Sequence, residues 1–383
     1  MPKNSIEDNV MTFVGRKAAD ASVENIHAVE REVIPARARC VPRREFLVGL
    51  AALGVSAFVP EISPPAQTPA SVPAVPHRID VHYHFSSPGF IAVITARKTG
   101  QRALMEWTPA KAIEAMDKGG VATSMASISE PGVWFGDNAA ARGLARECNE
   151  YGARLMADYS GRFGLFATLP MPDVDGALRE IEYSFDTLKA DGACFMTSYQ
   201  GKYLGDPAFT PVMDELNRRK AVVYTHPFRA ECCVNLLPEG EGLGITLTTD
   251  TTYTIASVLF SGTAARCSDI RFIWSHGGGT MPYITGRFSG GNRPDMAQKL
   301  PKGVMYEIQK FYYDTAQAVS SYTLAALTKL VPASHILFGT DSPFATAETN
   351  AKGLSDFGFS ANDIRAIERD NALGLFPRLK TAK

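Results

Sequence analysis

The segment RIDVHYH, residues 78–84, opens the folded part of the chain and decides which architecture it can adopt. Its apolar and polar side chains alternate, which predicts a strand, and His82 and His84 stand two positions apart. Because side chains at positions i and i+2 of a strand point to the same side, both imidazoles are expected to project together. A strand that ends in paired imidazoles indicates a site at one end of a sheet.

Seven further short runs of apolar or β-branched residues follow, with longer amphipathic segments between them. Strands are predicted at 121–128, 163–169, 192–198, 220–226, 270–276, 311–316 and 335–341. Helices are predicted at 138–157, 174–190, 208–219, 252–266, 319–330 and 361–373. This alternation predicts parallel βαβ units, and eight strands are the number that closes a (β/α)8 barrel. A doubly wound sheet is the competing architecture, but it would be expected to carry a glycine-rich phosphate loop after the first strand, where this sequence has none.

The composition is that of an ordinary globular chain. Its 383 residues include 39 Lys and Arg against 40 Asp and Glu, whereas a nucleic-acid-binding protein usually carries a basic surplus. Hydrophobic residues make up 45% and charged residues 21%, which argues against disorder. The six cysteines are scattered and form no C-x-x-C pair, so neither a disulfide scaffold nor a cysteine-based zinc site is expected.

The first 59 residues form an N-terminal extension that resembles a twin-arginine export signal. Arg43 and Arg44 stand in PRREFL, just before the apolar run 46–59, which is about 14 residues long and too short for a membrane anchor. Residues 60–76 contain six prolines and are expected to form an extended linker. We therefore expect a periplasmic or otherwise exported protein, or a cytoplasmic one if the signal does not function. Residues 77–383 would form a single catalytic barrel.

The histidines indicate the chemistry. Only seven occur in the chain, and four of them lie at predicted strand ends: His82 and His84 in the first strand, His226 in the fifth and His276 in the sixth. Asp341 ends the eighth strand. Because the carboxyl ends of the strands form the active-site face of a (β/α)8 barrel, these five side chains are expected to converge. Each alone could be structural, but imidazoles and a carboxylate together suit zinc and other first-row divalent ions.

Four motifs, in this order, resemble the amidohydrolase superfamily. They are the H-x-H pair, Thr225-His226-Pro227, Ser275-His276-Gly277-Gly278-Gly279 and Gly339-Thr340-Asp341-Ser342-Pro343. The resemblance covers roughly residues 78–375. It is closest to the branch that contains aminocarboxymuconate-semialdehyde decarboxylase, γ-resorcylate decarboxylase and 6-methylsalicylate decarboxylase, and it implies a metal-dependent barrel.

The resemblance also implies roles for the strand-end residues. His82, His84, His226 and Asp341 would hold one metal ion, and His276 would act beside it as an acid or base. The strand predicted at 192–198 has no Lys or Glu to bridge a second ion, which favours a mononuclear site. Zinc is the first expectation and manganese the second, since these ligand types do not separate the two well. No organic cofactor is expected.

Two reactions are compatible with these residues. In the first, the metal orients a substrate carboxylate while His276 or Asp341 protonates the ring carbon that loses CO₂. In the second, the metal lowers the pKa of a bound water, which attacks a lactone, ester or amide. The resemblance favours the first, a non-oxidative carboxy-lyase acting on a small hydroxyaromatic or related unsaturated acid. A metal-binding protein without catalysis is a further alternative.

Candidate substrate contacts follow the predicted strands. Trp134 and Phe135 could wall a flat pocket or pack on the barrel rim. Tyr199 could hydrogen-bond a phenol, and Arg229 could pair with a carboxylate or lie on the surface.

Two further residues raise questions of support and assembly. Asp314, in the seventh predicted strand, could orient a metal ligand or accept a buried hydrogen bond. Arg293 lies in a stretch that resembles one from which the aminocarboxymuconate relative offers an arginine to the neighbouring subunit's site. That resemblance implies a homodimer.

Overall fold

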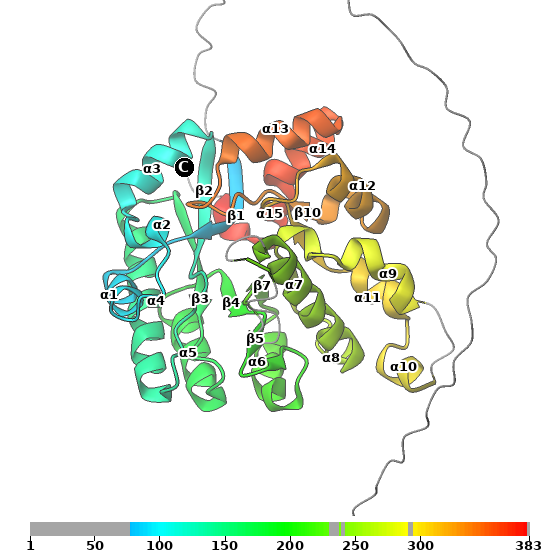
Figure 1. The fold of residues 1–383 in the computed structure, drawn as a ribbon, viewed down its shortest axis with the longest axis horizontal. Helices are drawn as coiled ribbons and strands as arrows, with labels where there is room; N and C mark the ends of the chain where they lie inside the picture. The colour runs from blue at the N-terminus through cyan, green and yellow to red at the C-terminus, as the bar shows by residue number, and fades with distance from the viewer. Residues whose placement is uncertain (1–76, 230–236, 239–241, 290–293, 381–383) are drawn as a thin grey trace, which may run out of the picture. The chain divides into compact units, whose positions relative to one another are not determined.

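Eight parallel strands form the centre of the protein, seen in a computed structural model that describes residues 77–229, 237–238, 242–289 and 294–380 (Figure 1). They are β1 (Arg78–His84), β2 (Val121–Ser127), β3 (Phe163–Thr168), β4 (Gly192–Met196), β7 (Val222–His226), β8 (Arg271–Trp274), β9 (Tyr312–Asp314) and β10 (Ile336–Leu337). Their order in the sheet follows the chain. The last segment returns to β1, where Val81 N donates to Phe338 O (2.9 Å) and His84 N to Ser342 O (2.8 Å). The expected (β/α)8 barrel is confirmed.

Helices surround this sheet (Figure 1). They are α1 (Pro88–Ala96), α2 (Arg102–Met105), α3 (Pro109–Lys118), α4 (Asn138–Asp158), α5 (Val174–Asp186), α6 (Thr210–Arg218), α7 (Leu243–Phe260), α8 (Thr263–Arg266), α9 (Met281–Ser289), α10 (Pro294–Lys299), α11 (Val304–Gln309), α12 (Ser321–Leu330), α13 (Ala347–Phe357), α14 (Ala361–Arg365) and α15 (Asn371–Leu375). Asp137 and Asp173 start α4 and α5 by accepting hydrogen bonds from the backbone of Ala140 and Gly176. No helix in the described ranges is long and apolar enough to cross a membrane. The expected signal (1–59) and linker (60–76) lie outside the described residues.

Helix α7 differs most from the sequence-based expectation. It begins at Leu243, nine residues before the start of the segment predicted at 252–266. Its first half is rich in threonine, a β-branched residue that favours strands. The threonine hydroxyls instead bond back to carbonyls one turn earlier, as from Thr248 to Gly244 (2.6 Å) and from Thr252 to Thr248 (2.9 Å). These bonds satisfy the hydroxyls within a helix.

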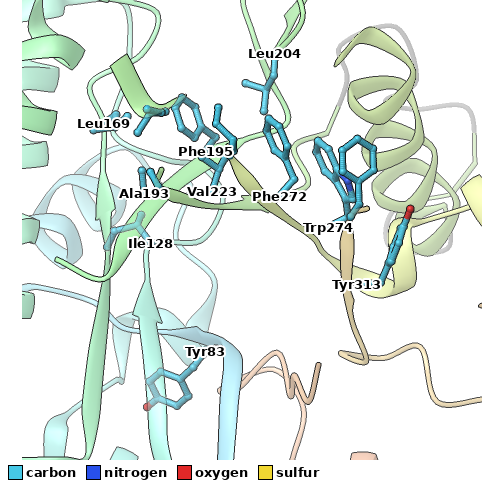
Figure 2. Packing of buried hydrophobic residues seen from close by; sticks show 14 of the residues in the cluster. Tyr83, Ile128, Leu169, Ala193, Phe195, Leu204, Val223, Phe272, Trp274 and Tyr313 are labelled. Carbon is cyan, nitrogen blue, oxygen red and sulfur yellow. The ribbon is translucent and has the colours of Figure 1, made fainter. Parts of the chain in front are cut away.

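Alternating side chains along each strand build two apolar layers. Phe166, Tyr224, Ile273 and Leu337 belong to a buried cluster inside the barrel, which Phe376 joins from the C-terminal segment. Their neighbours along the strands, such as Phe195, Phe272 and Trp274, pack in a larger outer cluster against the helices (Figure 2). Because apolar side chains fill the interior of the barrel, polar groups at the carboxyl ends of the strands lie directly above this inner cluster.

Candidate metal centre

Four side chains meet at the carboxyl end of the barrel. His82, His84, His226 and Asp341 each offer one ligand atom, and these atoms lie within 4.8 Å of one another. All four residues are buried, with at most 5% of their surface exposed. The structure therefore brings together the residues that the sequence motifs placed at the ends of the first, fifth and eighth strands.

An irregularity in β1 aims His82 into this group. Asp80 pairs with Ser124 and Tyr83 with Ala126, so β1 carries one more residue than β2 between these two pairs. Val81 packs in the inner cluster, and the ring of His82 also faces inward, 5.3 Å from that of Tyr224. Consecutive residues cannot face the same side of a regular strand, so the bulge is what allows it.

Hydrogen bonds on the far side of two rings set which nitrogen faces the group. Nδ1 of His82 lies 2.8 Å from Asp314 Oδ2, and Nδ1 of His226 lies 2.9 Å from Pro227 O. A carboxylate and a carbonyl can only accept, so we infer that each Nδ1 carries the proton. The Nε2 atoms of both rings are left to act as ligands.

His84 follows the same rule through a hydroxyl. Its Nδ1 lies 3.2 Å from Ser127 Oγ, and that hydroxyl donates its own proton to Tyr83 O at 3.0 Å. The serine oxygen therefore accepts from His84 Nδ1, which again leaves Nε2 unprotonated. The sequence motifs do not contain Ser127, but it ends the strand next to β1.

This arrangement fits a divalent cation. Nε2 of His82 and Nε2 of His84 lie only 3.1 Å apart, and Asp341 Oδ1 lies 3.2 Å from each of them. Two nitrogen lone pairs at this distance repel each other unless a positive charge stands close to both. Three imidazole nitrogens and one carboxylate oxygen form a donor set typical of a first-row divalent ion. The protein thus has a His/Asp metal-binding site.

The electrostatics of the group favour one positive charge. Burial lowers the pKa of His84 and of His226, which keeps both rings neutral. Burial acts in the same direction on His82, but the carboxylates of Asp314 and Asp341 outweigh it and raise the pKa of this ring to about 10. A proton on His82 would therefore compete with a metal ion for the same place.

His276 lies beside the four residues and is not one of them. It begins the short 3-10 turn that follows β8, with a left-handed backbone (φ 53°), and its ring centroid lies 4.8 Å from that of His82. Its Nδ1 lies 2.9 Å from Ala316 O, which can only accept, so Nδ1 carries a proton and Nε2 is free to take or give one.

Asp314 links the two groups. Its Oδ2 faces His82, while its Oδ1 accepts hydrogen bonds from the backbone N–H of His276 (2.9 Å) and of Ala316 (3.0 Å). The residue is fully buried. It thus serves in both ways that the sequence left open, as a partner of a histidine and as a buried acceptor.

Gln317 was missed by the motif analysis. Its amide nitrogen donates to Asp341 Oδ2, and its backbone is left-handed, with φ 50°. It lies in the loop after β9, three residues beyond Asp314. The rule that residues following barrel strands line the active-site face would have pointed to it.

Two of the proposed substrate contacts line one cavity. Trp134 and Tyr199 both border a cavity next to β2, β3 and β4. The Tyr199 hydroxyl already accepts a hydrogen bond from Met196 N at 2.8 Å, and the Trp134 indole donates to Asn138 Oδ1 at 3.0 Å. The Trp134 N–H is thus already bonded, whereas the Tyr199 hydroxyl accepts in its bond and still carries a proton that it can donate.

Two other proposed contacts, Phe135 and Arg229, do not line this cavity. Phe135 packs at the edge of the outer cluster, with the Arg97 guanidinium 4.5 Å above its ring. Arg229 is half-exposed and pairs with Glu130, its Nε 2.9 Å from Oε1. Arg293 lies outside the described residues.

A buried site of three histidines and an aspartate, set at the carboxyl end of a (β/α)8 barrel with a fourth histidine beside it, defines a metal-dependent hydrolase-type barrel. The chain belongs to the amidohydrolase family, whose model matches residues 79–378. All the site residues described above lie in the matched range.

Similar proteins span nearly the same length. A 6-methylsalicylic acid decarboxylase of Aspergillus aculeatus is 35% identical over 330 residues, which cover 80% of this chain and 98% of that protein. The decarboxylase yanB of Aspergillus niger is 33% identical over 324 residues, which cover 79% of this chain and 88% of that protein. The crystal structure of a dihydroxybenzoic acid decarboxylase from Polaromonas, with bound manganese and the inhibitor 2-nitroresorcinol, shares the fold with a TM-score of 0.66 and 22% identity, over 79% of this chain and 97% of that one.

Proposed function

We propose that the protein is a metal-dependent, non-oxidative decarboxylase of a small hydroxyaromatic acid, similar to 6-methylsalicylate decarboxylases. The similarity to the Aspergillus aculeatus enzyme carries this proposal, because it extends over 98% of that enzyme and 80% of this chain. The geometry alone is compatible with hydrolysis as well, since a metal-activated water would need the same ligands and an adjacent base.

We propose zinc as the resident ion, with manganese as the alternative. His82, His84, His226 and Asp341 would hold it. When bound, the ion supplies positive charge that neutralises and orients a carboxylate or phenolate. The manganese in the Polaromonas structure supports the alternative, and elemental analysis of the protein purified without added metal would decide between the two.

In this proposal His276 moves the proton. Its Nδ1 is held by Ala316 O, so a proton gained at Nε2 can be delivered toward the centre. The proton adds to the ring carbon that bears the carboxylate. When the bond to the carboxyl carbon breaks, its electron pair returns to the ring and CO₂ leaves, so no electron acceptor is required.

The proposal is tested with the full-length protein loaded with zinc or with manganese. Each form is incubated with 6-methylsalicylate and with a panel of hydroxybenzoates, and CO₂ release is followed together with the loss of acid. Lactones and aryl esters are assayed in parallel. Release of one CO₂ per acid consumed supports the decarboxylase, whereas turnover of a lactone or ester without any CO₂ would establish the hydrolase.

We also propose that residues 1–59 direct export through the twin-arginine route and that the enzyme is a homodimer. The first rests on Arg43 and Arg44 before a short apolar run. The second rests on the resemblance around Arg293. Light scattering of the purified protein measures the assembly directly.

A further inference from the structure

Four polar side chains form a stripe along one face of α7. They are spaced at i, i+3, i+4 and i+7, which places them one above another on the helix: Asp250, Tyr253, Thr254 and Ser257. Asp250 is only 1% exposed. Burying a carboxylate without hydrogen-bond donors is costly, so another segment must supply donors to this face of the helix.

A short hairpin after β4 covers this face. Its strands β5 (Ser198–Tyr199) and β6 (Lys202–Tyr203) form a separate two-stranded sheet. The two residues of the turn both have a left-handed backbone, with φ 52° at Gln200 and 73° at Gly201, as a tight hairpin requires. A two-stranded ribbon is marginally stable by itself, so contacts with the rest of the protein must hold it in place.

The stripe on α7 supplies these contacts. The ring of Tyr203 stacks on that of Tyr253, with centroids 5.6 Å apart, and its hydroxyl donates to Asp250 Oδ1 at 2.8 Å. Beyond the hairpin, Gly205 N donates to Ser257 Oγ at 3.1 Å. The chain that leaves the hairpin is therefore attached to α7 at several positions of the stripe.

Asp250 also holds the segments that follow two barrel strands. Its Oδ2 accepts from the hydroxyl of Thr197, just after β4, and from the backbone N–H of Phe228 at 3.3 Å, just after β7. Thr197 Oγ1 in turn accepts from Phe228 N at 2.9 Å, and Thr197 N donates to His226 O at 3.0 Å. One buried carboxylate thus joins β4, β7 and the hairpin.

These three segments build one wall of the cavity beside the metal centre, which has a volume of about 160 Å³. Met196, residues 198–200 and Phe228 all line it, and Met196 is the register partner of the metal ligand His226. Asp250 is not part of the lining. It can therefore affect a bound molecule only through the residues that it holds.

We propose that Asp250 is a positioning residue, which fixes the hairpin and Phe228 relative to the metal ligand His226 and thereby sets how tightly the site binds its acid. A carboxylate suits this place because it only accepts, and three donors point toward it. An amide would offer one acceptor and turn two donors toward the same groups. The effect on the acid rests on the proposed function, whereas the order of the hairpin can be measured without turnover.

The first experiment measures amide hydrogen exchange by mass spectrometry in the full-length, zinc-loaded protein. In Asp250→Asn, exchange over residues 197–205 and at Phe228 should rise at least tenfold, because these amides lose the contacts that protect them. Exchange in β1 and β10 should stay as in the wild type. Tyr203→Phe removes one of the three donors and should raise exchange in the hairpin but not at Phe228.

A matched control replaces a buried carboxylate at the opposite end of the barrel. The side chain of Asp191, just before β4, is 5% exposed and accepts from Leu165 N at 3.0 Å and from the Arg378 guanidinium. Asp191→Asn should leave exchange in the hairpin and at Phe228 unaltered. Equal exchange in the wild type and Asp250→Asn, or a uniform rise over the whole barrel, overturns the inference.

The second experiment uses turnover of the best acid from the hydroxybenzoate panel. Asp250→Asn should raise KM about tenfold and change kcat less than threefold, with one equivalent of metal retained, because Asp250 touches neither the ligands nor the cavity. Asp191→Asn should keep the wild-type KM. Loss of metal from Asp250→Asn, or an unchanged KM, would reject this role. If no acid releases CO₂ but exchange responds as described, the decarboxylase proposal fails while the positioning of the hairpin stands.

Discussion

Nδ1 of His82 lies 2.8 Å from Oδ2 of Asp314, and both side chains are completely buried. This hydrogen bond sets the orientation of the His82 ring, because it holds Nδ1 and so turns Nε2 toward the other ligands. The other oxygen of Asp314 accepts from the backbone of His276. One carboxylate therefore orients a metal ligand and also fixes the residue proposed to carry the proton.

Asp314→Asn should lower metal affinity by about 10- to 100-fold, the usual effect of losing a partner of a ligating histidine. The amide keeps the size of the side chain but removes the negative charge that favours a cation. Competition with a chromogenic chelator measures the dissociation constant. Glu180→Gln provides the control, since Glu180 is a buried carboxylate on α5 that bonds Asn149 and Arg146. An Asp314→Asn protein that holds metal as tightly as wild type would contradict this role.

Replacing His226 by Ala should leave well under one equivalent of tightly bound metal and abolish activity. His226 supplies one of only four donor atoms in the group. The control is His335→Ala, because His335 stacks on Tyr312 and is not part of this group. Elemental analysis after gel filtration gives the result. One full equivalent retained by His226→Ala would remove this residue from the ligand set.

His276→Asn should keep close to one equivalent of metal and lower kcat by roughly 10²–10⁴, which is about 3–5 kcal/mol of transition-state stabilisation. Asparagine suits this position because it tolerates the left-handed backbone that His276 adopts. The melting temperature should therefore change little. Metal content, melting temperature and kcat, measured on one preparation, separate three roles.

Each alternative role of His276 leaves its own signature. A purely structural histidine would give a lower melting temperature with a modest kinetic loss. A further ligand would lose metal together with activity. Near-normal turnover at full metal content would mean that His276 does not carry the proton and would assign that role to Asp341.

Gln317→Asn should weaken metal binding several-fold and reduce kcat without unfolding the protein. The shorter amide no longer reaches Asp341 Oδ2, so that carboxylate loses a fixed hydrogen bond. Asparagine again tolerates the positive φ at this site. Chelator competition and steady-state kinetics test the effect, and equal constants for the variant and wild type would show that Asp341 is held without Gln317.

Changing Arg43 and Arg44 to lysine should retain the protein, folded and metal-loaded, in the cytoplasm. Twin-arginine transport depends on the arginine pair and accepts folded proteins. Fractionation of cells that express the full-length chain measures the distribution. Deleting the linker residues 60–76 in a separate variant serves as the control for length. Undiminished export of the lysine variant would exclude this route.

Much of the site could be predicted from the sequence because strand geometry is simple. The two-residue spacing of His82 and His84 predicts that these two rings share a side, and the placement of His226 and Asp341 at strand ends predicts that all four residues lie at one end of a closed barrel. The same reasoning located all eight strands of the sheet.

The remaining features depend on contacts between distant segments. The extra residue in β1 that turns His82 inward is defined only by its pairing with β2. Gln317 acquires its significance from Asp341, which lies 24 positions away in the chain. The threonines of α7 favour a strand locally, but the segment forms a helix that buries Ile255, Val258 and Leu259 in the core, and the threonine hydroxyls bond to carbonyls one turn earlier.

The hydrogen bonds between β1 and the segment after β10 join the two ends of the barrel, and the ligands stand on both sides of this seam. His84 and Asp341 are 257 positions apart. A metal ion held by both binds the closed barrel and not the unfolded chain, so its binding stabilises the closure of this long loop. The complete ligand set exists only after the segment that contains Asp341 has paired with β1. Metal affinity is therefore expected to report on whether the two ends of the barrel have joined.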